Sequence, residues 1–420
     1  MQQILSIRRR ACSIVGMLDD EDEEAGRRLD AFIGKIGDCL GHAGRRASFA
    51  MYFHGLMGDG ARKSMEPIAA RTCGDPARSD SVHQKLGQFI TDSQWDDHAV
   101  RAIAAKEALD AMTAHQPVVA WIFDDTGFLK QGSHSVGVQR QYTGSAGKIT
   151  NCQIGVSLSI STAFWHVPCD FELYLPGCWT DDPERRREGK VPDGVEFKTK
   201  PELALQMLER AAAHGYPRGV VLGDTAYGDA VHFRNRVTEL GFQYALGIHG
   251  AALVRRIDGL GRLNGPVTHA EDLAKRLKVR RVTWRDGTMK RLTARFSFCR
   301  VVPAYADRST PVSDRDAVWL IVEYRDDTGE IKYYLATFPE DATKQHMVFV
   351  LKERYRTEQV YRDLKGELGL DHFEGRRFTG WHHHVTVALC CYAFVVAERA
   401  RAFPPSGARP RIPLSLLRPT

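Results

Sequence analysis

The chain lacks any long apolar run. None of its 420 residues belongs to a stretch of about 18 consecutive apolar residues, the length that a membrane-spanning helix requires. The basic N-terminal segment, residues 1–18, is not followed by an apolar run of signal length. We therefore expect a cytoplasmic protein without membrane contacts.

The nine cysteines show no pairing pattern. Their number is odd, and no two are spaced as in Cys-x-x-Cys. This argues against a disulfide framework and against a zinc site, and it indicates a reducing compartment. A strong charge imbalance is also missing, because 58 Lys and Arg face 52 Asp and Glu for a net charge of +6. Such a mild basic excess is compatible with nucleic-acid binding without identifying it.

Two common catalytic patterns are absent as well. The segment 144–150 (GSAGKIT) is similar to a phosphate-binding loop, but Tyr142 stands where the first glycine belongs and Ile149 follows the lysine. No convincing Gly-x-Ser-x-Gly element lies between a strand and a helix. The sequence therefore favours neither a nucleotide-binding loop of this type nor a serine hydrolase.

Patterning divides the chain into five parts. We expect a disordered start over 1–28, because residues 19–24 are a run of acids, and a helical domain over 29–115 with a helix opened by Asp96 or Asp97. Buried-type strands alternating with helices predict an α/β core built from 116–244 and 341–400. Residues 245–340 alternate as β-strands do and would form an insertion, and 401–420 would be a Pro/Arg-rich tail.

Carboxylates follow two of the predicted strands. Asp124 and Asp125 end the apolar run 118–123, and Asp224 ends the run 220–223. Ligands bind at the carboxyl ends of strands in α/β sheets. Adjacent residues of a strand point to opposite faces, so only one of Asp124 and Asp125 is expected to reach a shared site. The alternative is that each aspartate caps the following helix or turn.

A third carboxylate lies on a predicted helix near residue 358. Arg354, Glu358 and Lys365 are spaced by four and seven residues, so they share one helix face. Three carboxylates from two strand ends and a helix can hold two Mg²⁺ ions, which cut and join phosphodiesters. The alternative is an exposed helix with ion pairs, and three nearby acids compete as the third ligand: Glu353, Glu367 and Glu374. The consecutive histidines 382–384 diverge around a helix, which favours surface or packing roles over a metal site.

Three ordered blocks resemble the DDE class of bacterial insertion-sequence transposases. The segments 123–132 (FDDTGFLKQG) and 134–144 (HSVGVQRQYTG) are similar to the first-aspartate block, and 223–228 (GDTAYG) is similar to the second. The segment 355–376 (YRTEQVYRDLKGELGLDHFEGR) resembles the glutamate block. The helical segment 89–96 (FITDSQWD) is also similar. The resemblance covers roughly 29–400.

The resemblance implies a ribonuclease-H-like mixed-sheet core, with a β-rich insertion between the second aspartate and the glutamate and an N-terminal all-helical domain that binds DNA. The 134 residues between Asp224 and Glu358 leave room for that insertion. The first ligand of such relatives precedes Thr or Ser, so the resemblance selects Asp125 over Asp124. It implies that Asp125, Asp224 and Glu358 are catalytic and hold two Mg²⁺ ions, which Mn²⁺ can replace.

The resemblance further implies that Arg354, Lys365 and Lys130 contact DNA, while Leu351 departs from the tyrosine of the family's glutamate helix. Trp284 is the candidate aromatic for a flipped base, with a core tryptophan as its alternative. The expected function is cleavage at terminal inverted repeats and transfer of the 3′ ends into target DNA. Double-stranded DNA would be the partner, bound by a homodimer at the nucleoid. The alternatives are a DDE-type nuclease without transposition and an inactive DNA-binding relative.

Overall fold

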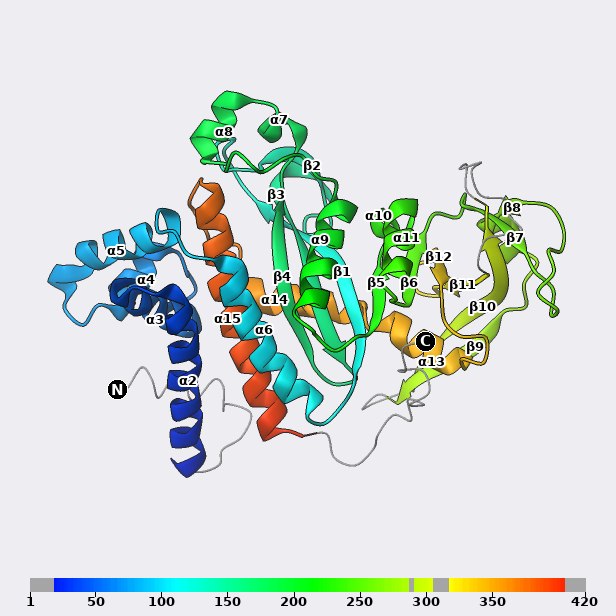
Figure 1. Cartoon of the computed structure of the whole chain (residues 1–420), viewed down its shortest axis with the longest axis horizontal. Helices are drawn as coiled ribbons and strands as arrows, with labels where there is room; N and C mark the ends of the chain where they lie inside the picture. Colours follow the sequence, from blue (N-terminus) through cyan, green and yellow to red (C-terminus); the bar gives the residue numbers. More distant parts are fainter. Residues whose placement is uncertain (1–18, 287–290, 305–316, 405–420) are drawn as a thin grey trace.

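Twelve strands form one continuous mixed sheet in the computed structural model of the chain, which describes residues 19–286, 291–304 and 317–404 (Figure 1). The strands are β1 (Val118–Leu129), β2 (Gln139–Thr143), β3 (Lys148–Thr162), β4 (His166–Tyr174), β5 (Val220–Gly223), β6 (Tyr244–Ile248), β7 (Leu253–Arg256), β8 (Thr268–His269), β9 (Arg280–Asp286), β10 (Arg291–Pro303), β11 (Val318–Tyr324) and β12 (Ile331–Ala336). Their order is β2-β3-β1-β5-β6-β12-β11-β10-β7-β8, with β4 paired to β3 and β9 to β10.

The helices fall into three groups along the chain. The N-terminal group is α2 (Asp19–Leu40), α3 (Ala43–Met57), α4 (Met65–Thr72), the short 3-10 helix η1 (Pro76–Arg78), α5 (Ser79–Thr91) and α6 (Asp97–Thr113). The middle group is α7 (Gly177–Thr180), α8 (Pro183–Gly189), α9 (Lys200–Ala213), α10 (Thr225–Gly228), α11 (Val231–Glu239) and α12 (Ala270–Ala274). The C-terminal group is α13 (Lys344–Lys352), α14 (Tyr355–Gly366) and α15 (Phe378–Ala402).

The central strands build the expected ribonuclease-H-like core. β1 lies antiparallel to β3 and parallel to β5, β5 lies parallel to β6, and β4 extends the antiparallel side. The apolar run 118–123 of β1 is buried throughout, because helices cover both faces of the sheet. The α/β mixed-sheet class predicted from the sequence is therefore confirmed.

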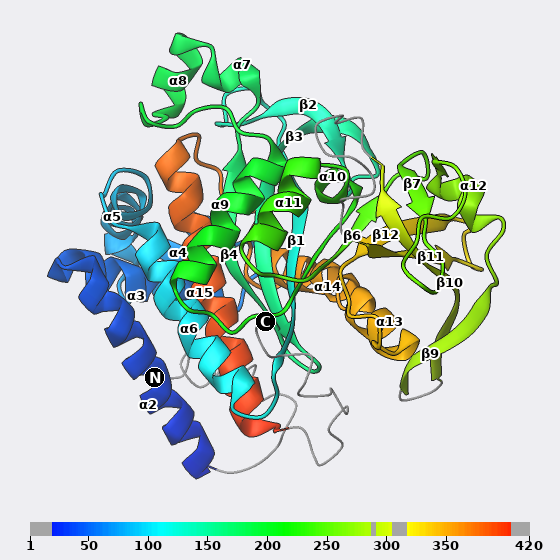
Figure 2. The same ribbon diagram turned by 45° about the vertical axis from the view of Figure 1, so that its right-hand side comes forward.

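Side chains of β1 alternate between the two helical layers. Phe123 packs on one face against Phe233 of α11, with ring centroids 5.7 Å apart. Phe128 packs on the other face against Trp381 of α15, at 5.5 Å. Figure 2 shows α9 and α11 on one side of β1 and α14 on the other. The two faces of this strand therefore have different neighbours, which decides where its two aspartates point.

The N-terminal helices start earlier than expected. α2 begins at Asp19, inside the segment 1–28 predicted to be disordered. Glu23 pairs with Arg27 and Glu24 pairs with Arg28, each one turn further along the helix, and such pairs stabilise a helix start rich in acids. Asp96 caps α6 by accepting a hydrogen bond from the Ala99 amide, as the sequence predicted. Residues 1–18 lie outside the described residues.

Helix α15 joins the N-terminal helices to the core, and the consecutive histidines 382–384 of this helix pack at that interface. The ring of His383 stacks on Trp95 with centroids 3.7 Å apart, and Nδ1 of His384 lies 2.8 Å from the Tyr52 hydroxyl. Burial lowers the pKa of each of these two histidines to about 4. The packing role predicted for the histidines is confirmed.

The β-rich segment shares its sheet with the core. β12 lies antiparallel to β6, with Leu335 opposite Leu246, so β7 to β12 extend the same sheet. The chain then returns through α13 into α14 beside β1 (Figure 1). In the core, β3 and β4 form a hairpin, with residues 163–165 as its turn. Among the described helices, none has the length and apolar character that a bilayer crossing requires.

Candidate active site

The adjacent aspartates of β1 face opposite sides of the sheet. Asp124 stands opposite Ser157 of β3, whose hydroxyl lies 2.6 Å from the Tyr361 hydroxyl of α14. Directly opposite residues of an antiparallel pair project to the same face, so Asp124 faces α14. Asp125 projects to the other face, where its Oδ2 accepts a hydrogen bond from Nζ of Lys200 in α9 at 2.7 Å. The glutamate helix therefore lies on the Asp124 side.

Asp124 is largely buried and carries one strong ion pair. Its Oδ2 lies 2.8 Å from Nη1 of Arg354, and only 13% of its side chain is exposed. Burial raises the pKa of Asp124 to about 7, with the charges of Asp224 and Asp125 adding to the rise and Arg354 opposing it. A carboxyl group with this pKa favours a nearby cation strongly, because the cation relieves the cost of the buried charge.

Asp224 follows β5 and caps a short helix. Its Oδ1 accepts a hydrogen bond from the Ala226 amide at 2.9 Å, which places it at the start of α10. The capping role that the sequence left open is thus present. It does not exclude a second role, since the second carboxylate oxygen, Oδ2, is not used by this cap.

Arg354 brings the three carboxylates into one electrostatic group. Although burial works against its charge, Asp124, Asp224, Tyr334 and Glu358 together raise the pKa of the Arg354 guanidinium above its ordinary value. Asp125, which the resemblance selects as the first metal ligand, lies on the opposite face of β1, where it pairs with Lys200. The side-chain directions place Asp124 on the side of Glu358.

Glu358 lies in the first turn of α14 and is exposed. Within the described residues its carboxylate has no hydrogen bond or ion pair, so it is available to a ligand. Two of its rivals are occupied. Buried Glu353 pairs with Arg356 at 2.7 Å, and Glu374 pairs with Arg62 away from α14.

The donor set suits a hard divalent cation. Asp124, Asp224 and Glu358 offer only carboxylate oxygens, which Mg²⁺ and Mn²⁺ prefer. In the part of the chain that the structure describes, their oxygens do not all lie within 4.8 Å of one another. The guanidinium of Arg354 supplies the positive charge at Asp124 instead. The chemistry of the three carboxylates fits such an ion, and binding one ion to all three would require their oxygens to come closer together.

Two lysines predicted to contact DNA are engaged within the protein. Nζ of Lys365 donates to the Gly127 carbonyl at 2.6 Å and lies 5.3 Å from the centre of the Phe128 ring. Nζ of Lys130 donates to the Phe373 carbonyl at 2.6 Å. Burial lowers the pKa of both ammonium groups. Each lysine therefore fixes the end of β1 against the segment that follows Glu358.

Trp284 lines a cavity that Glu358 also lines. The cavity has a volume of about 320 Å³ and lies between the β-rich segment and the start of α14. Nζ of Lys352 lies 5.2 Å from the centre of the Trp284 ring, and this lysine is paired with buried Glu323. The indole is half-buried, so the alternative of a fully enclosed core tryptophan does not describe it.

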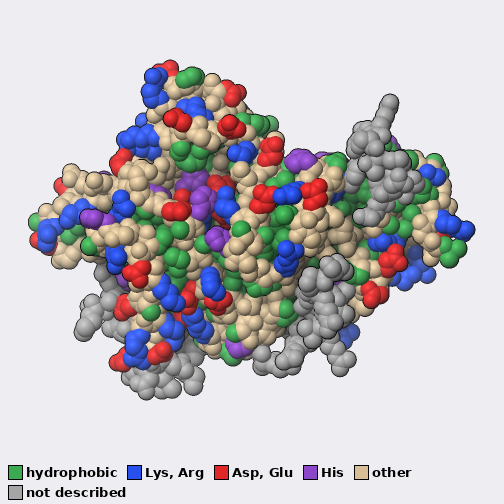
Figure 3. Space-filling view, in the orientation of Figure 1, with side chains coloured by type: hydrophobic (Ala, Val, Ile, Leu, Met, Phe, Trp, Pro, Cys, Tyr) green, Lys and Arg blue, Asp and Glu red, His purple; other side chains and the backbone are tan. Residues whose placement is uncertain are grey.

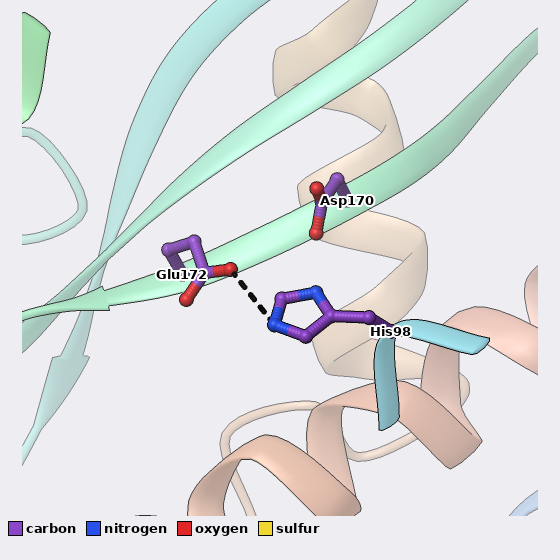
Figure 4. A group of neighbouring side chains, drawn as sticks. All are labelled: His98, Asp170 and Glu172. Atoms are coloured by element: carbon purple, nitrogen blue, oxygen red, sulfur yellow. Dashed lines mark ion pairs between the residues drawn. The ribbon is translucent and has the colours of Figure 1, made fainter. Parts of the chain in front are cut away.

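A different group of side chains, away from Asp124, has metal-ligand spacing. Ligand atoms of His98, Asp170 and Glu172 all lie within 4.8 Å of one another, and no further such group occurs among the described residues (Figure 4). Figure 3 shows histidine and acidic side chains gathered near the upper end of α15, below α8. The carboxylates are already balanced, because Arg210 lies 2.5 Å from Glu172 and Arg101 lies 3.2 Å from Asp170.

This second group is best described as a buried ion-pair network. Despite burial, a hydrogen bond from His382 and the charges of His382, Arg101 and Arg210 hold the pKa of Glu172 well below its usual range. Its members come from α6, β4, α9 and α15, so it joins the N-terminal helices to the core. The network was not predicted, and no sequence spacing reveals it. The same holds for Lys200, the partner of Asp125.

Comparison with known proteins identifies the family. The model of a DDE superfamily endonuclease domain matches residues 36–291, more than half of the chain, and includes both aspartate positions. The chain is also 30% identical over 199 residues to a protein of Microchaete diplosiphon named "Probable transposase for insertion sequence element IS701". That match spans about half the length of each chain, 47% in both cases. Together with the fold and the carboxylates around Arg354, these matches show that the chain belongs to the DDE superfamily of endonucleases.

Proposed function

We propose that the chain is a DNA transposase that cleaves at the ends of an insertion sequence and joins the 3′ ends to target DNA. The observation that carries the proposal is the grouping of Asp124, Asp224 and Glu358 around Arg354. The similarity to the transposase of insertion sequence element IS701 supports the choice of transposition over cleavage alone. Synapsis of two ends would require two copies of the chain on double-stranded DNA.

The proposed ligands are one aspartate of β1, Asp224 and Glu358. Two Mg²⁺ ions held by them would activate a water or a DNA 3′-hydroxyl and stabilise the leaving oxygen. For the first ligand the resemblance favours Asp125, whereas the direction of the side chains favours Asp124, which we adopt. In this arrangement Asp125 and Lys200 hold the opposite face of β1.

Arg354 is proposed to exchange partners during the reaction. Without DNA it balances Asp124. With a cation at Asp124, the Arg354 guanidinium would be free to contact a phosphate beside the scissile bond, a contact that adds affinity without reading sequence. Trp284 is proposed to stack on a base near the cut, because it lines the same cavity as Glu358.

The test uses a labelled duplex that carries the DNA flanking the gene on both sides, incubated with the protein and either Mg²⁺ or EDTA. We expect Mg²⁺-dependent cleavage at the ends and joining of the 3′ ends to a second DNA. Asp224→Asn should abolish both steps while keeping the helix cap, since asparagine caps as well as aspartate. Glu358→Gln should also abolish both steps. Glu209→Gln, at an exposed glutamate of α9, is the matched control.

Binding of the duplex separates the possible failures. If Glu358→Gln loses binding as well as cleavage, the carboxylate is structural and the assignment is wrong. Cleavage without joining would identify a nuclease of the same family. Binding without cleavage in either Mg²⁺ or Mn²⁺ would identify an inactive DNA-binding relative.

A further inference from the structure

A cavity of about 690 Å³ lies where three distant segments of the chain meet. Its walls are residues 61–62 before α4, the segment 129–135 after β1, and the segment 371–376 between α14 and α15. It does not share a lining residue with the cavity at Trp284. None of the proposed catalytic carboxylates lines it.

The walls of this cavity are fixed by hydrogen bonds to the segment 371–376. Nδ1 of His372 accepts from the Lys63 amide at 3.0 Å, and the Phe373 carbonyl accepts from Nζ of Lys130 at 2.6 Å. The Arg376 carbonyl accepts from the Val136 amide at 3.0 Å. The amide of Asn151 on β3 adds a clamp, donating to the carbonyls of Lys130 and Gly132. These hydrogen bonds hold the walls of the cavity together.

The charged residues around this cavity include cations that face solvent. Two acids line the cavity, and both face cations of the protein. Glu374 pairs with Arg62, and the charge of Asp371 raises the pKa of Lys130 and Lys365 against the effect of burial. Arg376, which also lines the cavity, is exposed and has no ion pair among residues 19–286, 291–304 and 317–404.

Arg140 adds a second cation of this kind. It is exposed, makes no ion pair within the same described ranges, and stands opposite Asn151, the residue that clamps the cavity wall. Both side chains of the Arg62–Glu374 pair are exposed, and exposed ion pairs are weak. Arg62 can therefore exchange Glu374 for another anion. Arg62 and Arg376 thus line the groove, Arg140 lies on the strand paired with the one that carries Asn151, and all three are available to an anion.

The position of the groove relates it to the proposed reaction. From Asp124 to Leu129, whose side chain lines the groove, β1 extends roughly 17 Å at 3.3–3.4 Å per residue. Phosphates of one DNA strand follow one another at about 3.4 Å along the duplex axis. That length equals about five base-pair steps, so one duplex held at Asp124 is long enough to reach the groove.

We propose that this groove, with Arg62 and Arg376 in its lining and Arg140 on the nearby strand β2, binds the phosphate backbone of the duplex DNA that the active site cuts. The inference rests on the proposed function for the position of the cut, but the groove and its charges stand independently. Contacts of this kind hold the register of the duplex on the protein and carry no sequence information.

The test is the salt dependence of binding. The equilibrium constant for a labelled duplex carrying the flanking DNA is measured by fluorescence anisotropy between about 50 and 200 mM salt. Each lost phosphate contact reduces the slope of log K against log salt by about 0.9, so Arg140→Gln/Arg376→Gln should reduce it by nearly two. Lys106→Gln, which removes an equally exposed cation from α6, should leave the slope unchanged. Thermal unfolding checks that all variants fold.

A neutral methylphosphonate, moved one position at a time along the duplex, locates the contact. We expect the wild-type protein to lose affinity when the neutral linkage replaces the phosphate that the groove holds, and the double variant to lose none further at that position. An unchanged slope in the double variant, an equal change in Lys106→Gln, or additive effects of linkage and variant would each overturn the groove. A reduced slope in a protein that never cleaves DNA would support the groove and refute the proposed function instead.

Discussion

Arg354 donates a hydrogen bond to Asp124 at 2.8 Å, across 230 residues of sequence. The pair joins the first strand of the core to the helix that carries Glu358. It also distinguishes Asp124 from Asp125, which pairs with Lys200 on the opposite face of the same strand. Two single substitutions can therefore decide whether Asp124 or Asp125 serves the cleavage reaction.

Asp124→Asn is expected to lower the cleavage rate about a thousandfold or more, since a catalytic metal supplies several kcal/mol and each 1.36 kcal/mol is tenfold. Asp125→Asn removes only the pairing with Lys200 and should lower the rate by no more than about 10- to 100-fold, as for groups that support a ligand. Single-turnover cleavage of the labelled duplex measures both. The reverse order of the two variants would return the ligand role to Asp125.

Arg354→Gln is expected to separate stability from catalysis. Asp124 can keep a proton near neutral pH, because burial has already raised its pKa to about 7. The loss in unfolding free energy should therefore be only about 1–3 kcal/mol, as for one lost partner of a buried group. Cleavage should fall by about 10²–10³, as for a lost electrostatic stabiliser. Urea unfolding and single-turnover rates provide the two values, with Arg354→Lys expected between wild type and Arg354→Gln.

His98→Ala is expected to leave the Mg²⁺ dependence of cleavage unchanged. Although His98, Asp170 and Glu172 have metal-ligand spacing, Arg101 and Arg210 already neutralise the two carboxylates. Titration of the cleavage rate with Mg²⁺ compares the variant with wild type. A large rise in the Mg²⁺ concentration needed for half-maximal rate would mean that this cluster holds a catalytic ion.

The protein is expected to lose stability as the pH falls from about 6.5 to about 4. The pKa of His383 and of His384 is lowered to about 4 by burial, so the unfolded chain takes up protons first. Their stabilising contribution is complete above pH 6.5 and is lost on acidification, by about 3 kcal/mol for each residue at 1.36 kcal/mol per pKa unit. Urea unfolding between pH 4 and 7 measures this, and His384→Gln should flatten the curve.

Trp284→Ala is expected to reduce the cleavage rate by roughly 5- to 150-fold, the equivalent of 1–3 kcal/mol for one stacked base. Trp284→Phe should retain most of the rate, since a phenyl ring also stacks. Trp319→Ala is the matched control, because Trp319 is half-buried in the same β-rich segment but does not line the cavity. Equal losses at both tryptophans would indicate a structural role for Trp284.

Local patterns predicted much of this fold. The apolar run 118–123 identified the central strand, and Asp96 identified the start of α6, because burial and helix capping depend on neighbouring residues. The acidic run 19–24, predicted to be disordered, begins α2 instead, because Glu23 and Glu24 pair with Arg27 and Arg28 one turn along the helix. The shared sheet of β6 and β12 was not predicted, because strand pairing between distant segments leaves no local pattern.

The candidate site was predicted less completely. Alternation along β1 implies that Asp124 and Asp125 diverge, but it does not say which one meets Glu358. That depends on which helix covers which face, which no single segment encodes. Lys200, Tyr334 and the network around Glu172 were missed for the same reason, because each contact joins elements that are distant in sequence.

The pairing of β12 with β6 also determines whether the β-rich segment can be removed, in evolution or by truncation in the laboratory. Its removal would turn β6 into an unprotected edge, with a row of free backbone N–H and C=O groups that invite aggregation. A catalytic fragment that lacks the β-rich segment would therefore need a replacement strand beside β6 to avoid association through that edge. The segment is not an accessory that the core can discard, because it closes the side of the sheet that the core leaves open.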